Sequence, residues 1–500
     1  MSSLPRPSGP VAWTAGVALL SVLYMALVVP LGFGPDETQH AFRAYQLALG
    51  NLFPQLVNCV AHPHLASCRP PLHARLVPHR RAGGALPYGL VHVFDYLYRR
   101  EHKPSGGPTR FGPRAYATLA GASLGGRTTF AHFENTALYS PANYIPQIVV
   151  FWIARLVGAP ALATMFAARL VGGLVWAALV SAAVAIVPRW KWLLSLAVLV
   201  PTALAQGSDI SADSLTLGVV ALTTAYALAL ADRGGVLRRR EVAALALLGL
   251  VIGLMKFPLL LILAALLALV WRALGGGRGR WLRAAAIAAP GVLAGVWWDL
   301  AADSYFVPYR DVVYRVGQRI AISEPRQLHH LISEPYVMAS IVWNTLAHGH
   351  LLYIDEVVGQ VGQNSLPGAL GIVWLAVFAL LALASGEGGG PSGRVRAWIG
   401  GTLLAYLLAT AVALYVTWSA VGASQISGMH GRYLTLVLVL ALPLLAGAGA
   451  RRFTLGPRTT RWAAVALSAV SAGWLYAYTS VHYYDAAPWT AVARVGSVLF

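Results

Sequence analysis

The amino-acid sequence predicts an all-α polytopic membrane protein with about eleven transmembrane helices. The first observation is composition: 57% of the 500 residues are hydrophobic and 11% are charged, whereas soluble domains carry about 25% charged residues. The second is pattern, because apolar runs of roughly 15 to 25 residues recur along the chain. The formal net charge of +19 falls mainly in short connections and one long loop, so we expect no nucleic-acid partner.

We interpret the apolar runs as spans of a single membrane domain, 1–500. The first span covers 11–33 and is too long for a secretory signal peptide, so we expect it to be retained. Outer segments follow at 34–160 and 303–365, with an outer tail at 483–500. The remaining spans lie within 161–302 and 366–482, and their runs are 161–187, 192–206, 215–231, 242–255, 258–271, 284–302, 366–384, 397–418, 433–449 and 462–482.

The basic connections between these runs orient the chain. Each of five short connections contains arginine, and all of them fall on one side if the spans alternate: Arg189, Arg238, Arg272, Arg394 and Arg451. Short cytoplasmic loops are enriched in Lys and Arg. We therefore expect the N-terminus in the cytoplasm and the C-terminus outside.

Some apolar segments do not fit a simple crossing. The stretch 242–271 is expected to cross twice, because both of its flanks are basic and Pro258 interrupts it. Segments 142–157 and 336–353 are also apolar, yet a crossing at either would invert the later basic loops. We expect re-entrant or surface-lying helices there. Residues 86–98 have the pattern of an amphipathic surface helix.

The two cysteines of the chain, Cys59 and Cys68, both lie in the first outer segment. On an oxidising outer face a disulfide is favoured, and two inert thiols are the alternative.

An acidic motif follows the first span directly. If Pro35 takes the first helical position, Asp36 and Glu37 lie at a helix N-terminus, where the helix dipole favours anions. Asp36, His40 and Arg43 then share one face of that helix. The sequence contains no P-loop, dinucleotide-binding fingerprint, zinc-ligand spacing or nucleophile elbow. Most acidic residues instead fall at or near the outer face, so we expect the site there.

Polar motifs recur between the apolar runs from position 35 to position 433. They are Pro35-Asp36-Glu37 with His40, Arg43 and Ala44; Asn135-Thr136-Ala137 with Tyr139-Ser140-Pro141 and Tyr144-Ile145-Pro146-Gln147; Ser211-Ala212-Asp213; Lys256; and Gly428 with Gly431-Arg432-Tyr433. In this order they resemble the GT-C superfamily of membrane glycosyltransferases and, more closely, a bacterial family called domain of unknown function 2142 (DUF2142).

The resemblance implies a GT-C-like fold and transfer of a sugar from a polyprenyl-phosphate donor. It places the active site at the outer face of a bacterial plasma membrane. Two departures stand out: His430 replaces an expected Gln before Gly-Arg-Tyr, and the turn Met255-Lys256-Phe257-Pro258 is looser than usual. Neither departure removes a candidate catalytic acid.

Within this reaction class, Asp36 is our candidate for the general base that takes the proton of the acceptor hydroxyl. Glu37 would orient the acceptor or assist through hydrogen bonds; the alternative is a helix-capping pair with no chemistry. Lys256 and Arg432 are the candidates for binding the donor phosphate. Alternatively, Lys256 and Arg432 are snorkelling charges at helix ends.

Further polar residues have two interpretations each. His40 and Arg43 either contact the phosphate or sugar or pair with the candidate base along the helix. Tyr139, Asn143 and Tyr144 either line the donor pocket or belong to an aromatic belt at the membrane surface.

The remaining charged residues are left open. Asp355 and Glu356 form either a second acidic pair at the site or a solvated loop. Arg169 lies inside a predicted span and should face a partner or a cavity. Asp209 and Asp213 either bind Arg169, bind a metal or cap the next helix. A divalent cation, Mg²⁺ or Mn²⁺, has ligands available but no spacing that requires it.

The leading functional hypothesis is a polyprenyl-phosphate-sugar-dependent glycosyltransferase, of inverting type, acting on a glycan, lipid or protein of the cell envelope. The alternatives are a transporter or flippase of lipid-linked envelope intermediates and a non-catalytic assembly subunit. The enzyme hypothesis requires an outer-face cavity that joins Asp36 to Lys256 and Arg432.

Overall fold

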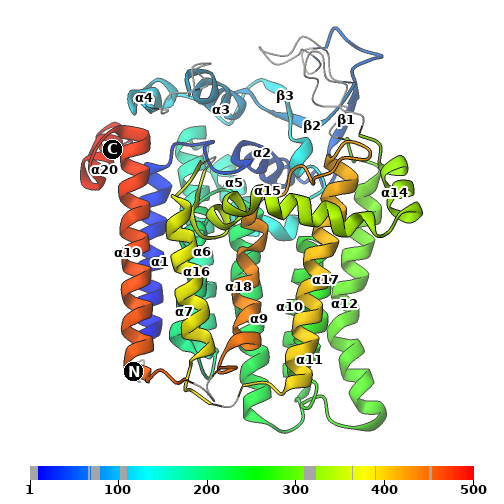
Figure 1. Cartoon of the computed structure of the whole chain (residues 1–500). Coiled ribbons are helices and arrows are strands. Elements are labelled where there is room, and N and C mark those ends of the chain that lie inside the picture. Colours follow the sequence, from blue (N-terminus) through cyan, green and yellow to red (C-terminus); the bar gives the residue numbers. More distant parts are fainter. Residues whose placement is uncertain are drawn as a thin grey trace.

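The computed structural model is a bundle of helices with a layer of shorter helices and a small sheet at one end (Figure 1). It describes residues 9–65, 68, 79–101, 110–308, 322–362, 364–388, 390–449 and 453–499. Helix α1 begins at the lower end of the bundle, and α19 ends at the upper end beside α20 (Figure 1). The described chain therefore begins at the lower end of the bundle and ends at the upper end, as the predicted topology requires.

Long apolar helices form the frame of the bundle. Within the described ranges, six are long and apolar enough to cross a membrane: α1 (Gly9–Val28), α6 (Ala161–Ile186), α9 (Ala212–Arg233), α12 (Gly277–Asp303), α17 (Gly393–Trp418) and α19 (Pro457–Tyr484). Ala and Leu, which have high helix propensity, dominate them. Most of their buried apolar side chains belong to one continuous core, and Ala411 and Tyr415 of α17 belong to a second, smaller cluster. The protein is therefore a multi-helix membrane protein, and the total of eleven spans stays a prediction.

Shorter helices complete the bundle: α7 (Lys191–Val198), α8 (Pro201–Gln206), α10 (Arg239–Met255), η4 (Phe257–Leu261), α11 (Ile262–Val270), α16 (Gly368–Leu383), η5 (Gly431–Leu434) and α18 (Thr435–Leu445). The predicted span 192–206 is not one helix. It breaks before Pro201, whose missing N–H cannot continue the hydrogen-bond ladder. The predicted hairpin 242–271 does turn at Lys256, which is extended between α10 and η4.

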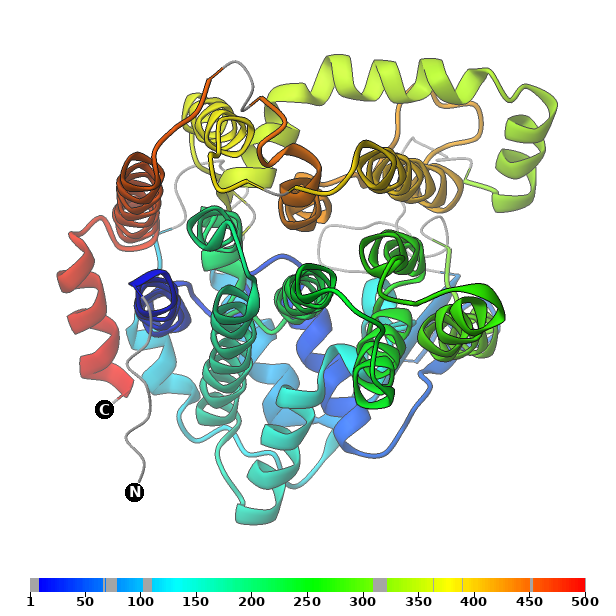
Figure 2. The same ribbon diagram turned by 90° about the horizontal axis from the view of Figure 1, so that it is seen from below.

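The upper layer carries helices that do not run along the bundle. They are α2 (Glu37–Ala48), α3 (Tyr88–Glu101), α4 (Arg114–Leu119), η2 (Glu134–Thr136), η3 (Pro141–Asn143), α5 (Ile145–Val157), α14 (Glu324–Ser333), α15 (Val337–Gly359) and α20 (Pro488–Leu499). Helix α15 lies crosswise in Figure 1 and along one edge of the bundle in Figure 2. Segment 336–353 is thus a surface-lying helix, as expected, and α5 likewise packs in the upper layer against α2 and α6.

The expectation of an all-α protein is wrong for both outer segments, 34–160 and 303–365. Strands β1 (Gln55–Asn58), β2 (Arg80–Pro87) and β3 (Thr128–His132) form an antiparallel sheet in that order, and β4 (Gln360–Val361) pairs with β5 (Asn364–Ser365). β2 is rich in Gly and Ala and lacks the β-branched residues that mark strands. It needs Gly83, because a Cβ there would lie 2.1 Å from the Ala131 carbonyl oxygen.

The same strand corrects the predicted surface helix at 86–98. Leu86 and Pro87 end β2, and the helix begins only at Tyr88. An amphipathic helix is present, but it starts two residues later and extends to Glu101.

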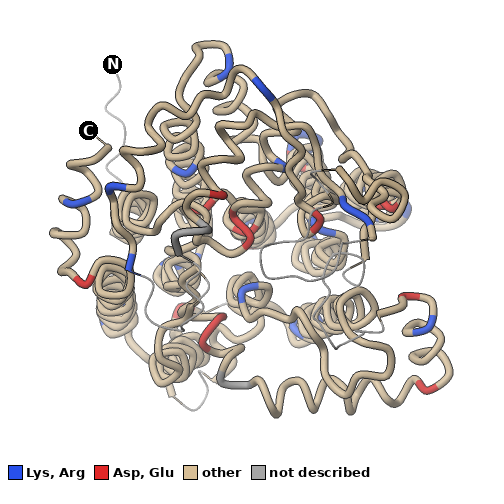
Figure 3. The backbone as a smooth tube through the Cα atoms, turned by 90° about the horizontal axis from the view of Figure 1, so that it is seen from above, with Lys and Arg blue, Asp and Glu red and all other residues tan. Residues whose placement is uncertain are grey.

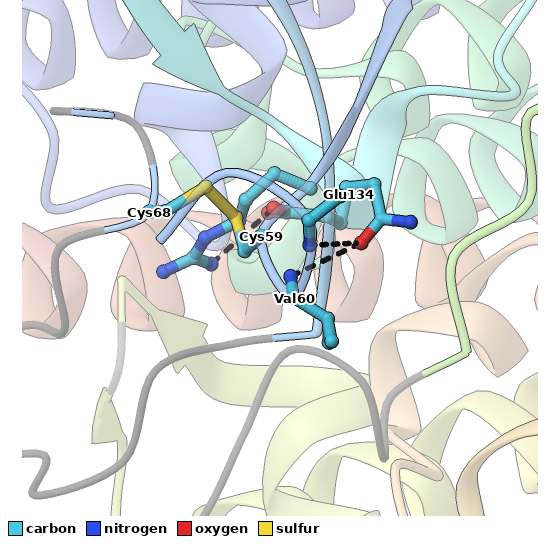
Figure 4. Close-up of a disulfide and its surroundings, with 7 residues drawn as sticks. Cys59, Val60, Cys68 and Glu134 are labelled. Carbon is cyan, nitrogen blue, oxygen red and sulfur yellow. Dashed lines mark hydrogen bonds and ion pairs between the residues drawn. A yellow bond between two sulfur atoms is a disulfide. The ribbon is translucent and has the colours of Figure 1, made fainter. Parts of the chain in front are cut away.

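A disulfide joins Cys59 and Cys68 next to the end of β1, with their Cα atoms 5.3 Å apart (Figure 4). The Cys59 N–H donates to the carbonyl oxygen of His79, just before β2. Figure 4 shows Val60 and Glu134 beside the bridge, and the Val60 N–H donates to Asn58 Oδ1. The expectation of a disulfide is confirmed over that of two thiols.

The basic connections gather at the lower end of the bundle. The chain between α6 and α7, between α9 and α10 and between α11 and α12 turns there (Figure 1). These connections contain Arg189, Arg238 and Arg272. The charge rule therefore predicts that the lower end faces the cytoplasm and the upper layer the outside, and this orientation stays a prediction.

Candidate functional site

Asp36 lies where α1 gives way to α2. It occupies the N-cap position of α2 in a left-handed conformation, φ 55° and ψ 16°. Few residues other than Gly adopt this region, although Asp and Asn do so more readily than most. The expectation that Pro35 begins the helix is wrong, because Glu37 is the first helical residue. The Asp36 side chain makes no capping hydrogen bond and is free to face another element.

That element is η5, which carries Arg432. Arg432 Nη2 lies 2.8 Å from Asp36 Oδ2, and Arg432 Nε lies 3.6 Å from Asp213 Oδ2 at the start of α9. Asp213 also pairs with Lys256 Nζ at the end of α10. Negative and positive groups therefore alternate from Asp36 to Lys256, and we call these four residues the charge chain. Figure 3 shows charged positions near the centre of the bundle as well as at its rim.

The charge chain lines one cavity of about 310 Å³. Its polar wall also includes Asn135, Thr136, His40, Tyr139, Gln206, His430 and Tyr433. Its apolar wall comes from Leu217, Pro258, Leu259, Tyr406, Leu414, Trp418 and Leu436. The cavity that the enzyme hypothesis required between Asp36, Lys256 and Arg432 is present.

Neither cation of the charge chain is a snorkelling residue. The Arg432 side chain is 6% exposed and the Lys256 side chain 19%. Lys256 Nζ lies 5.6 Å from the ring centroid of Tyr139 and 5.3 Å from that of Tyr433. Aromatic faces attract a cation at such distances. Both charges are therefore held inside the protein by carboxylates and rings.

The surroundings set the proton affinity of the acid and the rings near it. Burial raises the pKa of the Asp36 carboxyl, but Arg432 and His40 more than offset burial, so the pKa lies below its usual value. Burial lowers the pKa of His40 to about 4, so this imidazole is neutral at pH 7. Burial raises the pKa of Tyr139 to about 12, so its hydroxyl keeps its proton.

Glu37, predicted to take part in catalysis, points away from the cavity. It is fully buried in a bidentate pair with Arg169, with Nε 2.6 Å from Oε1 and Nη2 2.5 Å from Oε2. Its carboxylate also accepts the N–H of Gly32 at 2.9 Å. Arg169 donates further to the Val29 and Pro30 carbonyl groups beyond α1. Glu37 is thus the partner that Arg169 was expected to have, and it fixes the turn that presents Asp36.

Two residues predicted to touch the donor support the wall instead. Arg43 is fully buried and donates to the carbonyl oxygens of Tyr139, at 3.1 Å from Nε, and Leu52. Tyr144 is fully buried behind His40, with its hydroxyl 2.6 Å from His40 Nδ1. The expectation of donor contacts is therefore wrong for Arg43 and Tyr144. His40 does line the cavity and stacks on Tyr139, with ring centroids 5.5 Å apart.

Asn143 does not line the cavity and instead contacts the end of α10. It is fully buried, and its Nδ2 donates to the Met255 carbonyl oxygen at 3.0 Å. Ser140 Oγ donates to the neighbouring Leu254 carbonyl oxygen at 2.5 Å. The last carbonyl groups of a helix lack partners within it. Asn143 therefore fixes the end of α10, and with it Lys256, rather than lining the donor pocket as predicted.

The acidic pair on α15 does not line the cavity either. Glu356 accepts the Gly431 N–H at 2.5 Å and lies 3.2 Å from His430 Nδ1. Gly431 permits this contact, because a Cβ there would lie 2.2 Å from the Tyr353 carbonyl oxygen. Asp355 faces Gly368 at the start of α16. Glu356 therefore holds η5 from behind, and the expectation of a second acid pair at the site is wrong.

The residue types at the site were foreseeable, but some members were missed. The sequence left Asp213 open between pairing with Arg169, binding a metal and capping a helix, yet Asp213 links both cations. Its N–H donates to Ser211 Oγ at 3.1 Å, and Ser211 caps α9. Asn135 lines the cavity, with Nδ2 3.5 Å from Asp36 Oδ1. Both lie in the polar motifs of the sequence, which was the available signal. Asp209 does not line the cavity and lies beside Gly34.

No group of three or more His, Cys, Asp or Glu side chains in the described ranges is arranged to hold a metal ion. The two carboxylates of the cavity, Asp36 and Asp213, are each paired with a cation of the protein. The described residues of the cavity do not fit a divalent metal site.

Comparison with known proteins gives one match. A family model described as a predicted membrane protein, DUF2142, matches residues 19–441. Neither the curated proteins nor the solved structures contain a match. The matched range includes every residue of the charge chain.

Proposed function

We propose that this chain, which belongs to the DUF2142 family of predicted membrane proteins, is a glycosyltransferase that uses a polyprenyl-phosphate-linked sugar. The acceptor is a hydroxyl group of a cell-envelope glycan, lipid or protein. The proposal places the reaction at the outer face of the plasma membrane, with the N-terminus in the cytoplasm. The observation that carries it is a single cavity lined by Asp36, whose side chain is 35% exposed, and by the two cations Lys256 and Arg432.

The proposed step uses these groups as follows. The acceptor oxygen attacks the anomeric carbon of the sugar while the bond from that carbon to the phosphate oxygen breaks. Asp36 takes the proton of the acceptor hydroxyl, and polyprenyl phosphate leaves with the bonding electron pair. Lys256 and Arg432 stabilise the charge that grows on the phosphate. A positioned base of this kind contributes typically about 100- to 10,000-fold to the rate.

The pairing of Asp36 with Arg432 suggests an order of events. While Arg432 contacts Asp36, the carboxylate is a weaker base than usual, because the cation favours its charged form. A donor phosphate competes for the same guanidinium, which offers several donors in a fixed fork. Donor binding would therefore release Asp36 and strengthen it as a base.

The apolar wall of the cavity supports a lipid-linked donor. Leu217, Leu259, Leu414 and Leu436 come from four different helical segments and lie beside the charged groups. This mixture of apolar wall and convergent polar groups is typical of small-molecule sites. A soluble nucleotide sugar would leave that apolar surface without a partner, whereas the first isoprene units cover it.

The burial of Arg169 weighs against a transporter. A transport pathway would use intramembrane charge along its length. Arg169 is instead fully enclosed by Glu37 and by carbonyl groups next to α1. The charged residues of the charge chain lie at helix ends: Asp36 and Asp213 at the starts of α2 and α9, Lys256 at the end of α10 and Arg432 in η5.

The test is sugar transfer in membranes from cells that make wild type, Asp36→Asn or Asp485→Asn, with a panel of polyprenyl-phosphate sugars. Asn also tolerates the left-handed backbone of Asp36. Asp485 is a matched control, because it has φ 51° and pairs with Arg110 outside the cavity. Each variant is compared at equal abundance. We expect transfer by wild type and the control and a loss of about 100-fold or more in Asp36→Asn. Equal transfer by Asp36→Asn would remove Asp36 as the base, and no transfer by wild type with any donor would remove the proposed reaction.

A further inference from the structure

We propose that His430, held by Glu356, is a third cationic ligand of the donor phosphate, so that donor binding strengthens as the pH falls from 8 to 6. This inference rests on the proposed function. His430 takes no part in the proposed step and does not belong to the charge chain.

The two ring nitrogens of His430 have different surroundings. Nδ1 lies 3.2 Å from Glu356 Oε1, and Glu356 Oε2 is tied to the Gly431 N–H at 2.5 Å. The imidazole is therefore oriented by a carboxylate that is itself fixed. With Nδ1 turned to Glu356, Nε2 is the nitrogen left for a ligand. His430 lines the cavity, and its side chain is 40% exposed.

The neighbours of His430 define its electrostatic surroundings. Glu356 faces it from α15, and the Tyr433 ring meets it edge-on from η5, with centroids 5.9 Å apart. Arg432 follows two residues later and lines the same cavity. The other titratable groups that line it are Asp36 and His40 of α2, Tyr139 of the loop before η3, Asp213 of α9, Lys256 of the α10 end and Tyr406 of α17.

The charges of the cavity and of the bound phosphate indicate a role for His430. The charge chain contains two acids and two cations, so its formal charges cancel. A sugar phosphodiester brings one negative charge, and the departing polyprenyl phosphate carries up to two. Imidazole is the side chain whose charge changes between pH 5 and 8. In its protonated form, His430 adds the positive charge that the balanced chain lacks, through a hydrogen bond from Nε2–H to a phosphate oxygen.

The experiment measures binding of a short-chain, detergent-soluble polyprenyl phosphate to the purified full-length protein at pH 6, 7 and 8. This probe is the product shared by all donors of the class, so the sugar need not be known. The variants are His430→Gln, which keeps a polar side chain of similar reach, and Glu356→Gln. His132→Gln is the matched control, because His132 contacts Glu134 at 3.1 Å outside the cavity. Thermal unfolding shows that each variant is folded.

We expect His430→Gln to weaken binding about tenfold at pH 6 and less than about twofold at pH 8, whereas the control matches wild type at every pH. Comparing variants at one pH cancels the ionisation of the phosphate itself. Glu356→Gln should weaken binding at pH 6 in the same direction. Equal affinity of His430→Gln and wild type at pH 6, or equal weakening at pH 6 and pH 8, would overturn the inference. No binding by wild type at any pH would instead count against the proposed function.

Discussion

Arg432 Nη2 lies 2.8 Å from Asp36 Oδ2, although the two residues are 396 positions apart in the chain. The contact joins the N-cap of α2 to η5, just before α18, and so connects residues near both ends of the matched family range. Arg432 also reaches Asp213 through Nε. One guanidinium thus organises two carboxylates, which a point charge could not do with the same geometry.

Replacing Arg432 by Lys tests this division of labour. Lysine keeps the charge but loses the fork, so it can hold the donor phosphate or one carboxylate. We expect Arg432→Lys to retain transfer with a donor Michaelis constant raised about tenfold, and Arg432→Ala to lose transfer. Arg110→Lys is the control, because Arg110 pairs with Asp485 while both side chains are more than half exposed. Wild-type kinetics in Arg432→Lys would show that the fork is not needed.

The buried pair of Glu37 and Arg169 predicts a loss of stability rather than of chemistry. Removing one partner of a buried ion pair leaves an uncompensated charge and costs roughly 3–5 kcal/mol. We expect Glu37→Gln to lower the melting temperature and the abundance of the protein strongly. In the double variant Glu37→Gln/Arg169→Met, part of that loss should return, because no unpaired charge remains. Thermal unfolding in detergent measures both.

The control for this cycle is Asp232→Asn. Asp232 pairs with Arg189 at the lower end, where the two side chains are 36% and 33% exposed, so only a small shift in melting temperature is expected. If Glu37→Gln melts like wild type but lacks transfer, Glu37 acts in catalysis and the buried-pair explanation is wrong.

The neutral state of His40 predicts how stability depends on pH. Burial lowers its pKa from 6.5 to about 4 in the folded protein. A group with a lowered pKa contributes its full stability above the unfolded pKa and loses it as the pH falls toward the folded one. We expect acidification from pH 6.5 to 4 to destabilise wild type by up to about 3 kcal/mol more than His40→Gln. Unfolding followed from pH 7 to 4 measures the difference. His132→Gln, an exposed control, should follow wild type, and parallel curves for wild type and His40→Gln would contradict the prediction.

The sequence predicted the site best where one polar residue follows an apolar run. Lys256 and Arg432 were recognisable because each lies at a boundary of an apolar run, Lys256 at the end of α10 and Arg432 just before α18. The roles of Asp36 and Glu37 were not separable. They are adjacent acids, and only the left-handed backbone of Asp36 turns one toward the cavity and the other toward Arg169.

Other errors came from contacts that no local pattern encodes. Arg43 and Asn143 bind backbone carbonyl groups of segments far from them in sequence, so their polarity resembled that of ligands. The sheet was missed because β2 relies on Gly83 and on close strand approach rather than on strand propensity. The long apolar helices were predictable, because length and hydropathy alone determine them.

The Cys59–Cys68 disulfide allows a test of which side of the membrane the upper layer faces, because the chain contains no other cysteine. If the upper layer faces the outside, a membrane-impermeant thiol reagent should label intact cells only after treatment with an impermeant reductant. A cytoplasmic upper layer would give no labelling under either condition until the membrane is permeabilised. The control is Cys59→Ser, which leaves Cys68 as a single thiol that labels without reductant. The bridge lies outside the cavity, so we expect the Cys59→Ser/Cys68→Ser variant to keep transfer within about twofold of wild type while melting at a lower temperature. Labelling of wild type only after permeabilisation would show that the upper layer faces the cytoplasm. The charge chain would then lie on the cytoplasmic side, and this result would exclude the proposed transfer at the outer face.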